Sequence, residues 1–201
     1  MSLYLIGAGG HAKVVLSTLR AANREPDGLL DDDVSLIGKE ILGVSILGAP
    51  KDFSGRGHEA IVAIGGNKLR NEIAENYSFN WATAVHPRAW VDTSVTLGEG
   101  TVIFAGAIVQ PGSVIGRHVI LNTSSSVDHD CVIGDFCHIA PGTHLAGTVR
   151  ADEGAFVGIG SCIIPNRSIG AWSIVGAGSV VIRDVEPGMT VLGCPARSLS
   201  A

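Results

Sequence analysis

A six-residue repeat begins at Val85 and continues without an insertion through most of the second half of this 201-residue chain. Steps of six from Val85 reach seventeen positions, and sixteen of them are Val, Ile or Leu; Ala151 is the exception. Four places after each position the chain usually has a small or β-branched residue, as at Thr101, Ala107 and Ser113. This period suits a short strand and a corner, with one large and one small side chain pointing inward. Three such units form a triangular coil of eighteen residues, so the repeat predicts a parallel β-solenoid of five to six coils.

Glycines recur with the longer period of eighteen and support the coil. They fall into two registers: Gly98, Gly116, Gly134 and Gly170 in one, Gly158 and Gly176 in the other. We expect them to stack at corners, where the backbone conformation penalises a Cβ. The spacing does not predict handedness, because crossovers between parallel strands are normally right-handed. A purely structural solenoid is the alternative that the repeat leaves open.

Composition excludes several kinds of partner. The net charge is -5 and the pI is near 5.7, whereas a nucleic-acid surface needs clustered Lys and Arg. Mean hydropathy is +0.35, yet no apolar run approaches the roughly 20 residues that cross a bilayer. The four cysteines form no CxxC pair, and the first residues lack a charged leader followed by a long apolar stretch. We therefore expect no membrane span, no nucleic-acid partner and a cytoplasmic location.

The residues before the repeat have a different pattern. LYLIG is typical of a buried strand, GAGGHA of a glycine turn and KVVLSTLRAAN of a helix. Apolar runs at 28–30, 41–47 and 60–64 alternate with polar segments, and 68–76 has the character of a short helix. The fold class expected is thus α/β plus all-β. Residues 1–84 form a small Rossmann-like domain, 85–186 the solenoid and 187–201 a C-terminal capping segment.

The glycine turn suggests a phosphate-binding site. Gly7, Gly9 and Ala12 match G-x-G-x-x-G/A, and an acidic run at 31–33 follows about twenty residues later. Glycines permit close approach of the backbone, and free amides at a helix N-terminus attract phosphate. Because eighty residues make only half of a dinucleotide fold, a nucleotide sugar is favoured over NAD. A glycine turn without a ligand is the remaining alternative.

Histidines interrupt the repeat in the segment LNTSSSVDHDCVIGDFCHIAPGTHLAG. One coil before His129 the register places Pro111 and one coil after it Gly147, so His129 should project beside a position that leaves room for a ligand. His138 and His144 are six residues apart and therefore face different sides of the prism. They cannot share a zinc ion within one subunit, so no metal is expected, although ligands from a neighbouring subunit stay open.

The motifs GAGGHA, LLDDD, AIGGN, NTSSSVDHD, FCHIAPG and LGCPAR together resemble a group of bacterial sugar acetyltransferases. These join a nucleotide-sugar-binding α/β domain to a left-handed β-helix, and they include sialic acid O-acetyltransferases and bacillosamine-pathway and perosamine N-acetyltransferases. The resemblance covers essentially the whole chain. It implies acetyl-CoA as co-substrate and a UDP-, GDP- or dTDP-linked 4-amino-4,6-dideoxy sugar as acceptor. O-acetylation of sialic acid or a related sugar, and a non-catalytic sugar-nucleotide-binding scaffold, are the alternatives.

The resemblance also implies roles for individual residues. The proposed general base maps onto His129, with Asp130 as its acidic neighbour where many relatives have the longer Glu. His138 maps onto a histidine that contacts the acetyl group, and Gly147 onto a glycine whose backbone meets acetyl-CoA. Substrate contacts are implied for Gly9, Gly10, His11, Asp31, Asp32, Gly65 and Asn122.

These residue types suit acetyl transfer from a thioester to an amine. Histidine titrates in the range needed for a base that removes the proton of the attacking nitrogen, and a neighbouring carboxylate fixes its tautomer. The Gly147 amide and His138 are candidate donors to the thioester oxygen. Cys131 and Cys137 fall at interior positions of the repeat, so a cysteine nucleophile is not expected. The flat aliphatic faces of the prism predict side-by-side packing, and the resemblance implies a homotrimer with active sites between subunits.

Overall fold

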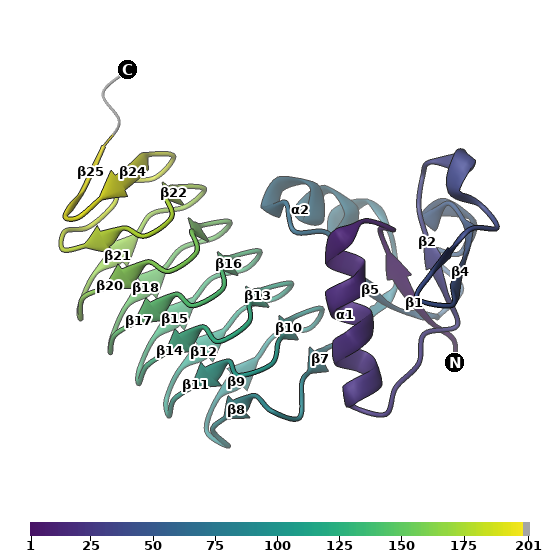
Figure 1. Ribbon diagram of the computed structural model, residues 1–201, viewed down its shortest axis with the longest axis horizontal. Coiled ribbons are helices and arrows are strands. Elements are labelled where there is room, and N and C mark those ends of the chain that lie inside the picture. Colours follow the sequence, from purple (N-terminus) through teal and green to yellow (C-terminus); the bar gives the residue numbers. More distant parts are fainter. Residues whose placement is uncertain (199–201) are drawn as a thin grey trace.

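A computed structural model describes residues 1–198 as a small α/β domain set against a three-sided parallel β-solenoid (Figure 1). The first domain contains β1 (Leu3–Ile6), α1 (Gly10–Ala21), β2 (Gly28–Leu30), η1 (Val34–Leu36), β3 (Glu40–Ile41), β4 (Val44–Gly48), η2 (Pro50–Asp52), β5 (Glu59–Val62), α2 (Asn67–Asn76) and β6 (Asn80–Trp81). Its sheet has the order β3-β4-β2-β1-β5-β6, and only the β3–β4 pair is antiparallel. The carboxyl ends of β1, β2 and β5 therefore meet at one edge, where an open α/β sheet binds ligands.

The solenoid is built from strands of two residues. They are β7 (Ala84–Val85), β8 (Trp90–Val91), β9 (Thr96–Leu97), β10 (Val102–Ile103), β11 (Ile108–Val109), β12 (Val114–Ile115), β13 (Ile120–Leu121), β14 (Ser126–Val127), β15 (Val132–Ile133), β16 (His138–Ile139), β17 (His144–Leu145), β18 (Arg150–Ala151), β19 (Phe156–Val157), β20 (Cys162–Ile163), β21 (Ser168–Ile169), β22 (Ile174–Val175) and β23 (Val180–Val181). The second residue of every strand is a position of the predicted six-residue frame.

Three sheets form the faces of the prism. Face 1 contains β7, β10, β13, β16, β19 and β22; face 2 contains β8, β11, β14, β17, β20 and β23; face 3 contains β9, β12, β15, β18 and β21. Paired residues are eighteen apart in the sequence, as in Ile120 with His138. The predicted coil of eighteen residues is thus confirmed.

The core of the prism consists of the frame positions. From Ile103 to Val181 all of them are buried, and burial of each full-sized aliphatic side chain stabilises the fold by roughly 1.5–3 kcal/mol. Cys131 and Cys137 are fully buried among them, as the repeat predicts. Small polar residues near the corners supply hydrogen bonds to backbone groups; for example, Thr143 Oγ1 donates to the carbonyl of Gly158 at 3.0 Å.

The corners have a left-handed backbone at every sixth residue from Gly100 to Gly178, and half of these positions are not glycine. The glycine registers identified from the sequence lie elsewhere, and the expected reason for them was wrong. Gly98 and its equivalents have no left-handed φ; instead, a Cβ at Gly98 would lie 2.6 Å from the backbone nitrogen of Arg117 in the next coil. These glycines are required because neighbouring coils approach closely.

The parallel pairing of the solenoid continues into residues 187–201, which were expected to form a capping segment. Strand β24 (Thr190–Gly193) pairs in parallel with β22 and extends face 1, and β25 (Ala196–Ser198) folds back antiparallel on β24. The last three residues of the expected cap, 199–201, lie outside the described part of the chain.

The N-terminal domain covers the early coils of face 1. Its apolar residues share one core with Ala84, Val102, Phe104 and Ile120 of the solenoid, and Figure 1 shows α1 beside the β7 end of the prism. Farther along the same face, on a later coil, the side chain of Ile174 is exposed to solvent.

Within residues 1–198 no helix has the length and apolar character to cross a membrane.

Candidate active site

His129 and Asp130 lie at the corner between faces 2 and 3, just after β14. His129 Nδ1 is 2.8 Å from Asp130 Oδ2, and both side chains are more than half exposed, at 59% and 64%. The backbone of Asp130 is left-handed (φ 57°), a conformation that Asp tolerates better than most residues. This conformation places the short carboxylate beside the imidazole of the preceding residue.

Two glycines make room for the pair. A Cβ at Gly147, one coil later, would lie 2.6 Å from His129 Cε1 and 3.0 Å from Cδ2; a Cβ at Gly112, one coil earlier, would lie 2.6 Å from Asp130 Oδ1. The expectation that the space beside Gly147 stays open for a ligand is therefore wrong. The imidazole itself occupies that space, because it lies against the bare backbone of the next coil.

The surroundings of His129 favour its charged form. The hydrogen bond to Asp130 raises the pKa of His129 above its ordinary value, and the negative charge of Asp128 adds to the effect. When neutral, the ring donates from Nδ1 to the carboxylate, which leaves the lone pair on Nε2 free to accept a proton.

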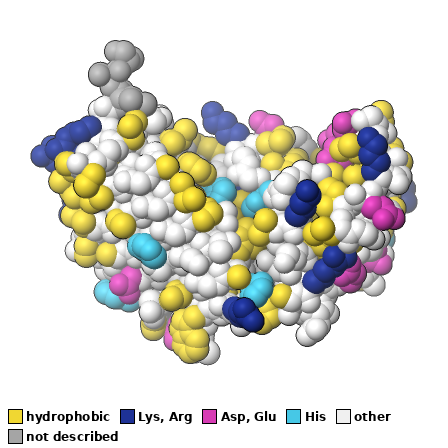
Figure 2. All heavy atoms as spheres, viewed as in Figure 1, with side chains coloured by type: hydrophobic (Ala, Val, Ile, Leu, Met, Phe, Trp, Pro, Cys, Tyr) yellow, Lys and Arg dark blue, Asp and Glu magenta, His cyan; other side chains and the backbone are white. Residues whose placement is uncertain are grey.

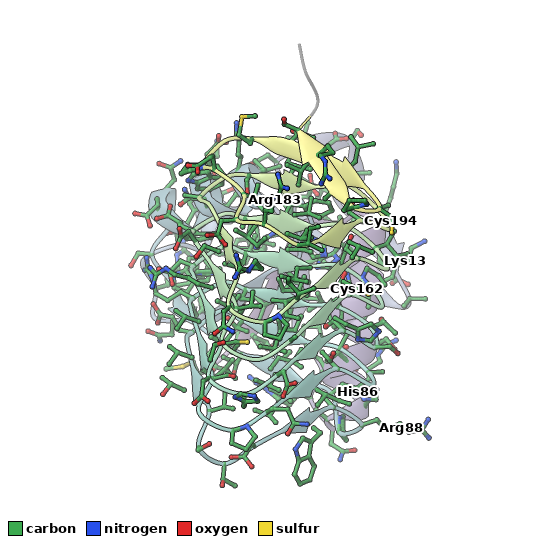
Figure 3. The ribbon with its side chains drawn as sticks, turned by 90° about the vertical axis from the view of Figure 1, so that its left-hand side faces the viewer. Lys13, His86, Arg88, Cys162, Arg183 and Cys194 are labelled. Atoms are coloured by element: carbon green, nitrogen blue, oxygen red, sulfur yellow. The ribbon has the colours of Figure 1, made fainter. Side chains whose placement is uncertain are left out.

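A groove of about 600 Å³ runs along face 2 beside this corner. Asp128 and Ala146, the residues that precede His129 and Gly147, line it. Cys162 also lines it and is labelled in Figure 3. A long, narrow ligand that lies in this groove can reach the His129 corner.

The glycine turn of the N-terminal domain borders a second cavity, of about 260 Å³. It lies at the carboxyl edge of the sheet and is lined by Gly7, Asp31, Asp32, Leu69 and other residues. A Cβ on Gly9 or Gly10 would meet no atom within 4 Å, so the approach to the first turn of α1 is open.

The two aspartates at this cavity differ in their hydrogen bonds. Asp31 Oδ2 accepts from the backbone N–H of Ala8 at 2.8 Å, and its Oδ1 accepts from Asp33 N–H at 3.0 Å. Asp31 therefore holds the glycine turn, a structural role that sequence reasoning did not foresee. Asp32 is exposed and is the more available carboxylate for a ligand.

His11, Gly65, Asn122 and His138 come together where the N-terminal domain meets face 1, and Figure 2 shows histidine side chains in this hollow. His138 Nδ1 lies 3.2 Å from the carbonyl of Gly65, and its Nε2 lies 3.0 Å from Asn122 Nδ2. The ring of His11 lies 6.3 Å from that of His138. Burial lowers the pKa of His11 to about 4 and that of His138 to about 3, and the charge of Arg70 adds to both shifts. Both rings are therefore neutral near pH 7.

The predicted site residues form two groups on opposite sides of the prism. His129, Asp130 and Gly147 lie at the corner between faces 2 and 3, whereas His138 starts β16 on face 1, opposite that corner. His144 is on face 2, so it does not share a side with His138. Within residues 1–198 no three His, Cys, Asp or Glu side chains gather in a way that could hold a metal ion.

Three residues near this junction were missed by sequence reasoning. Phe156 and Trp172 line a third cavity, of about 460 Å³, next to Gly65. Arg70 of α2 is 1% exposed and contacts both domains. The one sequence signal that could have placed Arg70 on the inner face of its helix is its spacing of three from the apolar Ile73, which is buried.

The fold and the two site halves are those of a hexapeptide-repeat acetyltransferase with an attached α/β domain. The family described as the PglD N-terminal domain matches residues 2–77. GDP-perosamine N-acetyltransferase of Escherichia coli O157:H7 is 33% identical over an alignment of 226 positions, which covers 99% of this chain and 97% of that protein. The chain belongs to the family of left-handed β-helix sugar acetyltransferases that includes perosamine N-acetyltransferase, which confirms the resemblance noted in its motifs.

Solved structures agree with this assignment. Perosamine N-acetyltransferase of Caulobacter crescentus, in a variant crystallised with CoA and GDP-perosamine, matches with a TM-score of 0.93 and 38% identity, over 100% of this chain and 98% of that one. The acetyltransferase domain of PglB from Neisseria gonorrhoeae, in complex with acetyl coenzyme A, matches with a TM-score of 0.90 and 38% identity, over 98% of each chain. The solenoid is therefore the left-handed β-helix of acetyltransferases.

Proposed function

We propose that this enzyme transfers the acetyl group of acetyl-CoA to the amino group of a nucleotide-linked 4-amino-4,6-dideoxy sugar. The observation that carries the proposal is the His129–Asp130 pair held against Gly147, in a chain similar over its full length to a GDP-perosamine N-acetyltransferase. Among UDP-, GDP- and dTDP-linked acceptors, the relatives favour the GDP-linked sugar.

The reaction needs a base, an oxyanion donor and a leaving thiolate. The sugar nitrogen attacks the thioester carbonyl, so a C–N bond forms and the C–S bond breaks. His129 Nε2 accepts the proton that the nitrogen loses and then returns it to the CoA thiolate. Asp130 stabilises the imidazolium, and the N–H of Gly147 is our candidate donor to the thioester oxygen.

His138 is less suited than expected to contact the acetyl group as a hydrogen-bond donor to the thioester oxygen. Asn122 Oδ1 accepts from the backbone N–H of Thr123 at 2.8 Å, so the amide presents its NH₂ group to His138 Nε2. That nitrogen is then an acceptor and has no proton to donate to an oxyanion. We therefore assign His138 to the wall of the acceptor site, beside Gly65.

The nucleotide portion fits the cavity at the glycine turn. The open approach over Gly9 and Gly10 admits a diphosphate to the N-terminus of α1, whose dipole and free amides favour negative charge. Asp32 is the exposed carboxylate for a hydroxyl group of the ribose or sugar. The sugar ring would then extend toward His11 and Gly65.

The separation of the two site halves supports a shared active site. Because the His129 corner lies opposite face 1, the base of one chain would act on a sugar held by another. A closed homotrimer of side-by-side prisms supplies this arrangement and covers the exposed Ile108 and Val114 of faces 2 and 3. The groove on face 2 would hold the long arm of acetyl-CoA. Four free thiols fit a reducing compartment, and we place the reaction in the cytoplasm.

The test is product analysis by mass spectrometry. The enzyme is incubated with acetyl-CoA and each of the UDP-, GDP- and dTDP-linked 4-amino-4,6-dideoxy sugars, and with the matching 4-hydroxy sugars and free sialic acid. We expect a 4-N-acetyl product from at least one amino sugar and none with His129→Ala at equal protein concentration. Acetylation of hydroxyl acceptors alone would identify an O-acetyltransferase, and no turnover with sugar-nucleotide binding retained would identify a scaffold.

A further inference from the structure

Arg70 is a fully buried cation that hydrogen-bonds only to neutral groups. Its Nε donates to the carbonyl of His118 at 2.8 Å and Nη1 to those of Ile64 (3.1 Å) and Gly65 (3.2 Å). Its Nη2 donates to Asn67 Oδ1 at 3.1 Å and to the carbonyls of Phe136 (2.7 Å) and Cys137 (3.3 Å). Among the described residues no carboxylate forms an ion pair with it. One guanidinium thus joins the N-terminal domain to two successive coils of the solenoid.

Burial of such a charge opposes folding. Desolvation lowers the pKa of Arg70 to about 10, so the side chain is still protonated near pH 7. Replacement of a buried ion pair by apolar side chains of similar volume is often neutral or stabilising, and Arg70 lacks even the counter-ion of such a pair. Stability of the junction alone therefore does not account for an arginine at this position.

The carbonyl of Gly65 connects Arg70 to the acceptor site. It accepts from Arg70 Nη1 and also faces His138 Nδ1 at 3.2 Å. A ring nitrogen beside a carbonyl oxygen must carry the proton. The orientation of the Asn122 amide leads to the same tautomer. The backbone N–H of Thr123 donates to Asn122 Oδ1, so the NH₂ group of Asn122 faces His138 Nε2. That nitrogen accepts, and the ring proton is therefore on Nδ1.

We propose that Arg70 is a positioning residue, which fixes the Gly65 carbonyl so that His138 is held as the Nδ1–H tautomer and accepts at Nε2 from the Asn122 amide, whose second N–H serves the acceptor sugar. One N–H of Asn122 Nδ2 is used by His138, and the other is left for a substrate oxygen. The other groups that pack around this ring are the neutral His11 and Phe156, whose ring lies 5.2 Å from that of His138. The effect on the reaction depends on the function proposed above; the tautomer does not.

The first test reads the tautomer directly. Enzyme labelled with ¹⁵N-histidine is examined by long-range ¹H–¹⁵N NMR at pH 7, and the His138 signals are assigned by their loss in His138→Gln. We expect the pattern of a neutral ring with the proton on Nδ1. A proton on Nε2 would overturn the proposal, whatever the activity of the enzyme.

The second test compares Arg70→Lys with Arg24→Lys. Lysine keeps the charge but has three donors on one nitrogen, so it cannot serve both domains. Arg24 is a matched control, since it also lies near the domain junction and donates to the carbonyl of Thr83 at 3.1 Å without contacting Gly65. For Arg70→Lys we expect a mixture of His138 tautomers and a fall in kcat of about 10- to 100-fold, with the KM for acetyl-CoA within about two-fold. Arg24→Lys should leave kcat and the NMR pattern unchanged.

A folded Arg70→Lys that keeps the wild-type tautomer and kcat would refute the role of Arg70. If that variant does not fold, Asn122→Asp tests the same contacts from the other end. A carboxylate facing Nε2 should attract a second proton to that nitrogen while the Gly65 carbonyl retains the proton on Nδ1, and a ring protonated on Nε2 alone would contradict the proposal. If the wild type acetylates no amino sugar, the proposed function fails, and the NMR pattern still decides the tautomer.

Discussion

Gly147→Ala should separate catalysis from folding at the His129 corner. The backbone of Gly147 is not left-handed, so alanine fits it and stabilises slightly by restricting the unfolded chain. The new Cβ, however, would lie 2.6 Å from His129 Cε1. Carbon atoms need about 3.5 Å, so the imidazole must move by about 1 Å. Because the ring is exposed, it can swing toward solvent and leave the fold intact.

The expected loss follows from that displacement. A misplacement of about 1 Å in a catalytic group can reduce turnover about 10²-fold, whereas loss of the base in His129→Ala should cost about 10²- to 10⁴-fold. The two changes remove the same function, so Gly147→Ala should cause little further loss of kcat in the His129→Ala background.

The assay is steady-state kinetics together with thermal unfolding, and Gly43→Ala is the control. Gly43 is left-handed (φ 81°) with nothing within 4 Å of its Cβ, so alanine there should lower Tm and leave kcat unchanged. Gly147→Ala should do the opposite. Full activity of Gly147→Ala, or additive losses in the double variant, would refute the placement of the base against this glycine.

Three further outcomes follow from the site. Asp130→Asn removes the carboxylate that raises the pKa of His129, so the base becomes neutral at lower pH; the acidic limb of the kcat/KM–pH profile should shift to lower pH while the maximal rate falls. Asp32→Ala should raise the KM of the sugar nucleotide but not that of acetyl-CoA. Asp31→Ala should have the same effect on KM and should also lower Tm, because two backbone N–H groups lose their acceptor. Equal effects on the KM of both substrates would argue against separate sites. At a sugar-nucleotide concentration below the raised KM, mixed oligomers of His129→Ala and Asp32→Ala should be more active than the mean of the two variants alone, and sedimentation of a fully active monomer would exclude the shared site.

The solenoid could be predicted from the sequence because its core repeats. Each aliphatic residue of the frame occupies an environment equivalent to that of the residue eighteen places earlier, one coil below, so periodicity alone identifies strands and buried positions. The reason for the glycines was missed because close approach between coils and a left-handed backbone both exclude a Cβ, and only coordinates distinguish them. The His129–Asp130 pair was predicted because its members are adjacent in the chain.

The junction between the domains could not be predicted in the same way. His138 is buried by the loop after β5, more than seventy residues earlier in the sequence, and no periodicity relates the two segments. The same holds for Arg70, whose two shortest hydrogen bonds to the solenoid go to carbonyls 48 and 66 residues away. For Asp31 the acidic run suggested a ligand contact, yet its two carboxylate oxygens accept from the backbone N–H of Ala8 in the glycine turn and from that of Asp33.

Because the coils are stacked, the height of a residue along the prism axis changes in fixed steps of one coil. Adjacent coils are separated by one strand spacing, about 4.8 Å, and each consumes eighteen residues. An insertion of six or twelve residues into a coil would keep later aliphatic side chains in the core but move them to another face, and an insertion that is not a multiple of six would turn them out of the core. A change in length before the His129 coil that keeps His129 on its corner must therefore add or remove whole coils, and each added coil would carry the proposed base one step away from the domain proposed to hold the acceptor. Coils added after β20 would lengthen the prism and leave that spacing unchanged.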